Sequence, residues 1–277
     1  MPAFVNLSAY KFVPLENLPA VQERLRREAR AGELKGTVLL SAEGINLFVA
    51  GRRAKAEAFL SIVRSVPGLG DLTPKESASA AAPFGRMLVK IKREIIAFGV
   101  EGIDPARRPT AKLPPAELKR WLDEGRPVTL LDTRNDYEVE RGTFRGALRT
   151  GIRRFRDFPT AARRLDPALK DQPVVMFCTG GIRCEKAGPF LEREGFRQVF
   201  QLDGGILKYF EHCGGAHYEG DCFVFDERDG VDAALRPTSS LLTADNTTAE
   251  TANVWPAPPS AQAMGEAQRA AAIADRT

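Results

Sequence analysis

Hydrophobic and polar positions follow two different periods in the first hundred residues. Positions 6–13 alternate with a period of two, which predicts a strand, and positions 18–31 repeat apolar residues with helical spacing. A β-branched run, a turn at Glu43-Gly44-Ile45-Asn46 and a second helical stretch come next. The predicted order is strand, helix, strand, strand, helix, strand, over 6–13, 18–31, 36–40, 47–50, 54–66 and 87–91.

This βαββαβ order is typical of a ferredoxin-like sandwich, in which two helices cover one face of an antiparallel sheet. We therefore predict a ferredoxin-like α+β domain over residues 1–100. Residues 101–115 contain four prolines, which interrupt both periods. They predict a linker.

Continuous apolar runs replace the alternation in the second half of the chain. The runs at 128–132, 174–178 and 198–202 are separated by helical stretches, of which 113–124 and 183–194 are the clearest. Apolar runs between helices are typical of a parallel sheet that helices cover on both faces. The fold class is therefore α/β, with the ferredoxin-like domain preceding a parallel α/β domain.

A chain of 277 residues exceeds the usual size of one hydrophobic core, which supports two folded domains. We place the second domain at 116–215 and a C-terminal extension at 216–235. Residues 236–277 are rich in Ala, Thr, Ser and Pro, so we predict a flexible tail. A short helix at 260–274 would be marginal alone.

Charge is unevenly distributed. Residues 1–112 hold 18 Lys and Arg against 11 Asp and Glu, whereas the rest holds 22 against 25. A basic first domain attracts polyanions such as RNA, although a solvated surface explains the same charge. No apolar run reaches the roughly 18 residues of a membrane helix, and residues 1–13 lack a signal-peptide pattern. We expect a cytoplasmic protein without membrane contact, whose cysteines stay reduced.

The segment Cys178-Thr179-Gly180-Gly181-Ile182-Arg183 joins an apolar strand to a helix. Ligands of parallel α/β sheets bind beyond the carboxyl ends of strands, which is where Cys178 lies. The glycines let successive amides turn inward around an anion, and the helix presents its positive end. Arg183 adds a cation, so we predict that Cys178 is a thiolate, with a pKa below the usual value of about 8.5. A buried, inert cysteine is the alternative.

The landmarks around this loop resemble a rhodanese domain. Asp132-Thr133-Arg134 is followed by Gly142-Thr143-Phe144-Arg145-Gly146-Ala147, the Cys-x4-Arg loop and Asp203-Gly204-Gly205-Ile206. Six positions from Cys to Arg suit sulfur in that family, and the phosphatase relatives have one more, so phosphatase activity is disfavoured. Protease chemistry is also disfavoured, because the two histidines lie in an unrelated stretch.

The longer string from Phe177 to Lys186, FCTGGIRCEK, resembles the bacterial tRNA uridine 5-hydroxylase family. The likeness covers roughly residues 7–235 and includes Tyr10-Lys11-Phe12, Lys92-Arg93-Glu94-Ile95 and Cys222-Phe223-Val224-Phe225-Asp226. It implies an oxidoreductase that uses molecular oxygen to convert the wobble uridine of tRNA to 5-hydroxyuridine. The sequence shows no flavin, haem or iron motif and no obligate protein partner, so the reductant stays unassigned.

The resemblance also implies roles for individual residues. Cys178 is the catalytic cysteine, able to form a persulfide or a transient oxidised state, in a loop that Arg183 holds. Asp132 and Arg134 would support the loop, but an internal ion pair explains them equally well. Cys184 lies in the first turn of the next helix, as a resolving thiol or as a packing residue.

Eight arginines lie between 141 and 164, against a single acid, Asp157. An RNA-binding strip beside the active site has this composition, and so does a solvated surface. Members of the family usually carry an Asn-Pro motif in the segment after Ala147, which this chain lacks, so the choice of tRNA is open. The RNA-binding candidates are Arg149, Arg153, Arg154 and Arg156, with Lys90, Lys92 and Arg93 of the first domain.

His212, Cys213, His217 and Cys222 raise the question of zinc, but their spacing matches no standard finger, and we assign no metal. The leading prediction is a tRNA uridine hydroxylase. The alternatives are a thiosulfate or persulfide sulfurtransferase, acting through a Cys178 persulfide, and a binding module without catalysis. A sulfurtransferase does not need a basic first domain, and an idle module does not need the cysteine loop.

Overall fold

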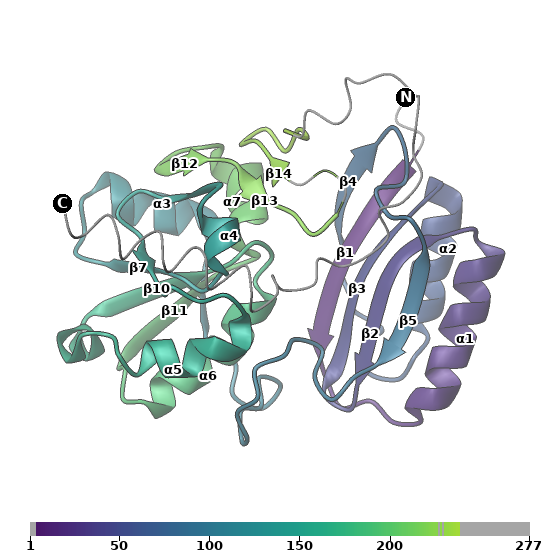
Figure 1. The fold of residues 1–277 in the computed structure, drawn as a ribbon, viewed down its shortest axis with the longest axis horizontal. Coiled ribbons are helices and arrows are strands. Elements are labelled where there is room, and N and C mark those ends of the chain that lie inside the picture. The colour runs from purple at the N-terminus through teal and green to yellow at the C-terminus, as the bar shows by residue number, and fades with distance from the viewer. Residues whose placement is uncertain (1–3, 227, 229, 239–277) are drawn as a thin grey trace, which may run out of the picture. The chain divides into compact units, whose positions relative to one another are not determined.

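The computed structural model of the chain describes residues 4–226, 228 and 230–238. Its first sheet has five strands in the order β4-β1-β3-β2-β5, and two helices cover one face (Figure 1). The elements are β1 (Phe4–Phe12), α1 (Leu18–Ala31), β2 (Lys35–Ser41), β3 (Gly44–Gly51), α2 (Arg53–Arg64), β4 (Lys75–Ser79) and β5 (Met87–Ile91).

Alternation in the sequence sets the buried face of this sheet. Val5, Leu7 and Ala9 of β1 are buried at every second position, in one hydrophobic cluster with Leu25 of α1 and Val63 of α2. Strands and helices thus bury the faces that their periods predict.

The fourth strand of the βαββαβ order is β4, which the sequence did not reveal. It pairs antiparallel with β1, from Phe4↔Ser79 to Ser8↔Lys75. Its sequence, Lys-Glu-Ser-Ala-Ser, has no large apolar residue, because it is an edge strand whose side chains are at least partly exposed. The predicted strand at 87–91 exists as β5, but it lies at the opposite edge and runs parallel to β2, so the sheet is mixed rather than antiparallel.

The second sheet is parallel throughout, with the order β6-β11-β10-β7-β9. Helices α3 and α7 cover one face and α5 and α6 cover the other (Figure 1), which confirms the predicted layers. Its elements are β6 (Ala111–Leu113), α3 (Pro115–Asp123), β7 (Thr129–Asp132), α4 (Asp136–Val139), β9 (Leu148–Arg149), α5 (Phe158–Ala162), β10 (Pro173–Phe177), α6 (Ile182–Arg193), β11 (Gln198–Leu202) and α7 (Gly205–Cys213), with 3-10 turns at Phe155–Asp157 and Pro167–Asp171.

The segment predicted as a linker contributes to the second domain. Its last residues form β6, an edge strand with Leu113 buried. Just before this segment, Phe98 packs against Phe155 and Phe190 in the core beneath α6. Part of the predicted linker is therefore packed structure of the second domain.

The C-terminal extension adds two small antiparallel sheets. Strand β12 (Tyr218–Gly220) pairs with β8 (Gly142–Phe144), and β13 (Cys222–Phe223) pairs with β14 (Gly230–Val231). All but the first three residues of the predicted tail, and the helix considered at 260–274, lie outside the described residues. Within the described part of the chain, no helix is long and apolar enough to cross a membrane.

Candidate active site

Cys178 lies directly after β10, at the carboxyl edge of the second sheet, and its side chain is 0% exposed. The amide of Gly181 donates a hydrogen bond to Sγ of Cys178 at 3.1 Å. Gly181 has a φ of 103°, a left-handed conformation that favours glycine, and α6 begins at the next residue. The loop thus has the curled backbone that the sequence predicts around an anion.

Helix α7 holds this loop from its other side. The amides of Ile206 and Leu207 donate to the carbonyl oxygens of Cys178 and Thr179, at 3.0 and 3.1 Å. A Cβ on Gly205 would lie 2.4 Å from the carbonyl oxygen of Cys178, so only glycine fits there. This close approach explains the Asp203-Gly204-Gly205-Ile206 landmark.

The surroundings of Cys178 favour a thiolate. Burial alone would raise the pKa of its thiol, but the hydrogen bond from Cys184, the charge of Arg183 and the amides of Arg183 and Gly181 hold that pKa well below its usual value. Burial and the neighbouring sulfur raise the pKa of Cys184. The opposite pKa shifts therefore place the negative charge of the pair on Cys178 and keep Cys184 neutral.

Arg183 is paired with a carboxylate that the sequence analysis did not single out. Its guanidinium donates to both carboxylate oxygens of Glu138, at 2.5 and 2.7 Å, and both side chains are buried. The ring of Phe225 lies 5.6 Å from the guanidinium carbon. A buried arginine needs a counter-charge, and that requirement was the available signal for Glu138.

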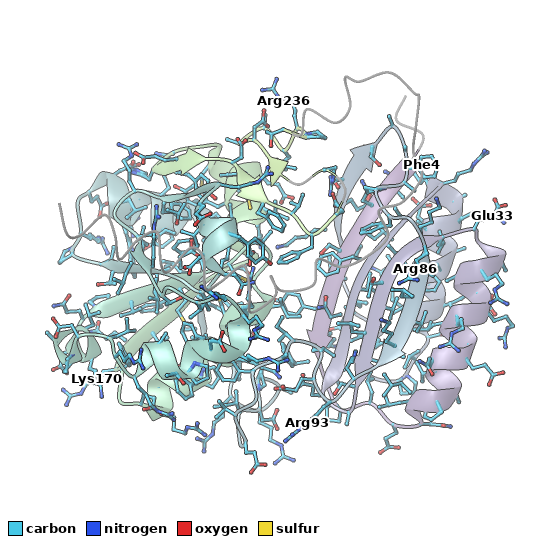
Figure 2. The ribbon with its side chains drawn as sticks, viewed as in Figure 1. Phe4, Glu33, Arg86, Arg93, Lys170 and Arg236 are labelled. Carbon is cyan, nitrogen blue, oxygen red and sulfur yellow. The ribbon has the colours of Figure 1, made fainter. Side chains whose placement is uncertain are left out.

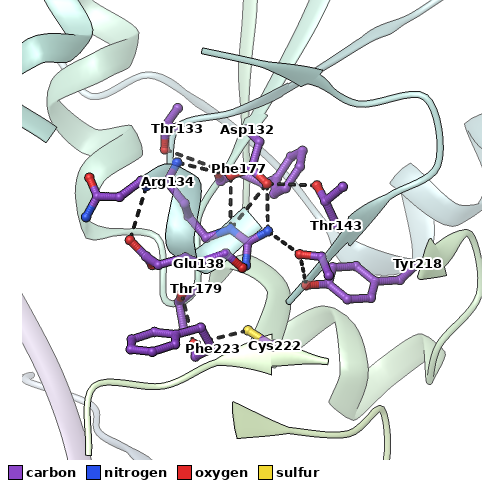
Figure 3. A network of polar contacts seen from close by, with 12 residues as sticks. Asp132, Thr133, Arg134, Glu138, Thr143, Phe177, Thr179, Tyr218, Cys222 and Phe223 are labelled. Atoms are coloured by element: carbon purple, nitrogen blue, oxygen red, sulfur yellow. Dashed lines mark hydrogen bonds and ion pairs between the residues drawn. The ribbon is translucent and has the colours of Figure 1, made fainter. Parts of the chain in front are cut away.

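Asp132 and Arg134 form an ion pair of 2.6 Å with both side chains fully buried (Figure 3). Thr143 donates to Asp132 at 2.8 Å, and Arg134 also donates to the carbonyl oxygens of Gly142 and Glu138. Among the described residues, neither side chain forms a hydrogen bond with the cysteine loop; Arg134 instead contacts the backbone of Glu138, and Asp132 lies opposite Phe177 in the pairing of β7 with β10.

Thr133, between these two residues, does contact the site and was missed. Its hydroxyl donates to the carbonyl oxygen of Phe177 at 3.0 Å and lies 3.7 Å from Sγ of Cys184. It thereby links the end of β10 to the second sulfur.

The first domain contacts the helix that follows the loop, and both sheets belong to one compact unit. The hydroxyl of Tyr10 donates to Glu185 at 3.0 Å, and Lys186 pairs with Glu94 at 2.7 Å and Glu43 at 2.9 Å. The Glu-Lys that follows Cys184 is therefore one of the segments through which the two domains interact.

Two family models match the chain: a "UPF0176 acylphosphatase like domain" over residues 4–95 and a "Rhodanese-like domain" over residues 114–212. A Bordetella petrii protein named tRNA uridine(34) hydroxylase is 51% identical over 246 residues, which cover 87% of this chain and 98% of that protein. Proteins of the same name from Cupriavidus necator and Variovorax paradoxus are each 49% identical, over 84% and 88% of this chain and 84% and 94% of their own lengths.

The chain belongs to the tRNA uridine(34) hydroxylase family. This membership confirms the resemblance seen in the sequence, and it makes the chain an enzyme with a rhodanese domain. The first domain is of the acylphosphatase type, in agreement with the βαββαβ order.

The seven residues that the sequence predicts to bind RNA are all exposed. Arg149 lies opposite Asp132 in the pairing of β9 with β7, at the same sheet edge as Cys178. Arg149 and Arg156 line a surface hollow with Arg164, whereas Arg153 and Arg154 precede the 3-10 turn.

The first domain carries a second basic hollow, between α1 and β5. It is lined by Arg26, Arg30, Lys35, Arg86 and Lys90, with one acid, Glu33. Lys92 and Arg93 follow β5, and Arg93 lies 3.7 Å from Glu101 (Figure 2 labels Glu33, Arg86 and Arg93). Apart from Lys90, the residues of this hollow were not singled out in the sequence.

The His and Cys residues considered for zinc are not gathered into a ligand set. Among the described residues, no three His, Cys, Asp or Glu side chains converge as metal ligands. His217 bonds Asp123 at 2.7 Å instead. Cys222 is fully buried, which raises the pKa of its thiol to about 12.

Proposed function

We propose that this chain hydroxylates the wobble uridine of tRNA to 5-hydroxyuridine, with molecular oxygen as co-substrate and Cys178 as the catalytic residue. The observation that carries the proposal is a fully buried Cys178 whose sulfur accepts a hydrogen bond from the amide of Gly181, in a chain about half identical to proteins named tRNA uridine(34) hydroxylase. The lowered pKa of this thiol favours its thiolate form. A thiolate is the reactive form of cysteine in nucleophilic and redox chemistry.

The electron balance of this reaction suggests a role for the second sulfur. Oxygen takes up four electrons in forming a C–OH group and water, and the uridine C5–H bond supplies two of them. Oxidation of Cys178 and Cys184 to a disulfide would supply the other two, and each of these two buried thiols shifts the pKa of the other. An external thiol would then restore the pair by exchange.

The basic hollows supply a surface for the tRNA backbone. Five Lys and Arg side chains line the hollow between α1 and β5, and three arginines line the hollow beside β9. Phosphate contacts from such side chains provide most of the sequence-independent affinity for nucleic acid. Arg149 lies at the Cys178 edge of its sheet, which supports an approach of the anticodon loop from this side.

Nucleoside analysis of tRNA from cells that lack the gene tests the proposal. Loss of 5-hydroxyuridine, and its return with a plasmid copy, is expected; an unchanged level would remove the proposal. Growth under ¹⁸O₂ should place the heavy atom in the new hydroxyl, whereas label from heavy water would refute the role of oxygen. Sulfur transfer from thiosulfate by the pure protein, without any loss of 5-hydroxyuridine in the deletion strain, would favour the sulfurtransferase alternative.

A further inference from the structure

We infer that Lys75, on edge strand β4 of the first domain, is a positioning residue of the Cys178 site that fixes the cysteine loop and places a cation near its thiolate. The inference rests on the proposed role of Cys178. It makes the first domain a part of the active site as well as a surface for RNA.

The contacts of Lys75 join two backbone segments of the site. Its ammonium donates to the carbonyl oxygen of Gly180 at 2.9 Å and to the carbonyl oxygen of Gly204. Gly180 lies within the cysteine loop, and Gly204 is the residue before α7, whose first amides hold the loop carbonyls. One side chain thus clamps both halves of the cradle from outside the rhodanese domain.

The charge balance of the site also needs this residue. Arg183 is paired with Glu138, so its charge is shared between that carboxylate and the thiolate of Cys178. Lys75 lies near Cys178, Glu211, Asp203 and Lys208, and Asp203 already pairs with Lys208 at 2.5 Å. Through its contacts with Gly180 and Gly204, the ammonium of Lys75 therefore adds a second positive charge beside the cysteine loop.

The environment of Lys75 agrees with this role. Burial lowers the pKa of its ammonium to about 8, and the negative charges of Cys178, Glu211 and Asp203 act against that decrease. The ammonium and the thiolate therefore stabilise one another's charged forms.

A second contact shows how closely the first domain fits the loop. A Cβ on Gly181 would lie 2.8 Å from the hydroxyl of Tyr10. Tyr10 lies in β1, which pairs with the strand of Lys75. The two neighbouring strands therefore present one side chain to each glycine of the loop.

The test is a pH titration of the Cys178 thiolate in the full-length protein. The ultraviolet absorbance of the thiolate is followed, and the curve of the same protein with Cys178→Ala is subtracted. Lys75→Gln should raise the midpoint by about one unit or more, which is about tenfold less thiolate at a pH below both midpoints. Lys75→Arg keeps the charge but cannot place one ammonium between the two carbonyl oxygens, so it should raise the midpoint by a smaller amount. Lys55→Gln, an exposed lysine on α2, should leave the midpoint unchanged.

A midpoint for Lys75→Gln equal to that of wild type would overturn the inference, as would an equal shift in Lys55→Gln. If Lys75→Gln fails to fold, the comparison of Lys75→Arg with wild type decides: a higher midpoint with the charge kept supports the clamp, and an unchanged one refutes it. The readout needs no tRNA, so failure of this inference is distinct from failure of the proposed hydroxylation.

Discussion

Arg183 donates one hydrogen bond to each carboxylate oxygen of Glu138, and both side chains are buried beside the cysteine loop. Glu138 is itself fixed, because it forms a capping box with Asn135 at the start of α4. The guanidinium is therefore oriented before any substrate arrives. Neither Arg183 nor Glu138 can leave the pair without leaving a buried charge uncompensated. The positive charge of Arg183 is therefore held in a fixed position near Cys178.

Glu138→Gln should destabilise the fold, since it leaves the buried Arg183 without a counter-charge. Removing one partner of a buried ion pair costs about 3–5 kcal/mol. Chemical denaturation would measure the change in the free energy of unfolding. Glu219→Gln breaks the exposed pair with Arg145 and is the matched control, which should have little effect. Equal destabilisation of the two variants would contradict the assignment.

The stabilisation that the Cys178 thiolate gives the fold should depend on pH in one direction. A thiol whose folded pKa lies below its unfolded value of about 8.5 stabilises the fold fully above that value. The contribution is lost as the pH falls through the folded pKa. The free energy of unfolding of wild type, less that of Cys178→Ala, should therefore grow from acid toward alkaline pH. A difference that is flat or falls with pH would show that the folded pKa is not lowered.

Two substitutions of Cys184 separate hydrogen bonding from redox chemistry. Cys184→Ala removes the donor and should raise the pKa of Cys178, whereas Cys184→Ser keeps a donor and should largely preserve that pKa. The thiolate titration distinguishes the two variants.

The same variants test Cys184 as the resolving thiol. After turnover, Cys184→Ser should leave an oxidised Cys178 that mass spectrometry of the intact protein detects, because no second sulfur is available for a disulfide. Unchanged activity with no trapped species would rule out this role.

The hollow between α1 and β5 should bind phosphates of the tRNA backbone. A double charge reversal, Arg86→Glu with Lys90→Glu, should weaken tRNA binding. It should also reduce the slope of log affinity against log salt concentration by about one unit for each phosphate that is no longer neutralised. Arg52→Glu with Lys55→Glu makes the same charge change at and within the start of α2, outside this hollow. Equal weakening by both double variants would mean that only net charge matters.

Much of the fold was predictable because burial enforces a period. Strand β11, strand β5 and helix α1 have the bounds that their patterns predict. Strand β4 was missed for the opposite reason. An edge strand of Ser, Ala, Lys and Glu gains its stability from backbone hydrogen bonds to β1, and these bonds do not require a pattern of apolar side chains.

The residues of the site were also predictable only in part. Cys178 and Arg183 were predictable because their loop is a local sequence unit with its own geometry. Glu138, Thr133 and Lys75 reach the site from other elements, at separations of 45, 51 and 105 residues along the chain. Their contacts depend on how strands and domains pair, and a single sequence does not record that pairing.

The most direct test of the account is the level of 5-hydroxyuridine in tRNA from cells in which the only copy of the gene carries Cys178→Ala. Cys213→Ala, at the end of α7, serves as the matched control. The account predicts that the Cys178 variant restores no 5-hydroxyuridine to the deletion strain and that the Cys213 variant restores it as wild type does. A wild-type level with Cys178→Ala, at equal protein abundance, would contradict the claim that this thiolate carries the chemistry.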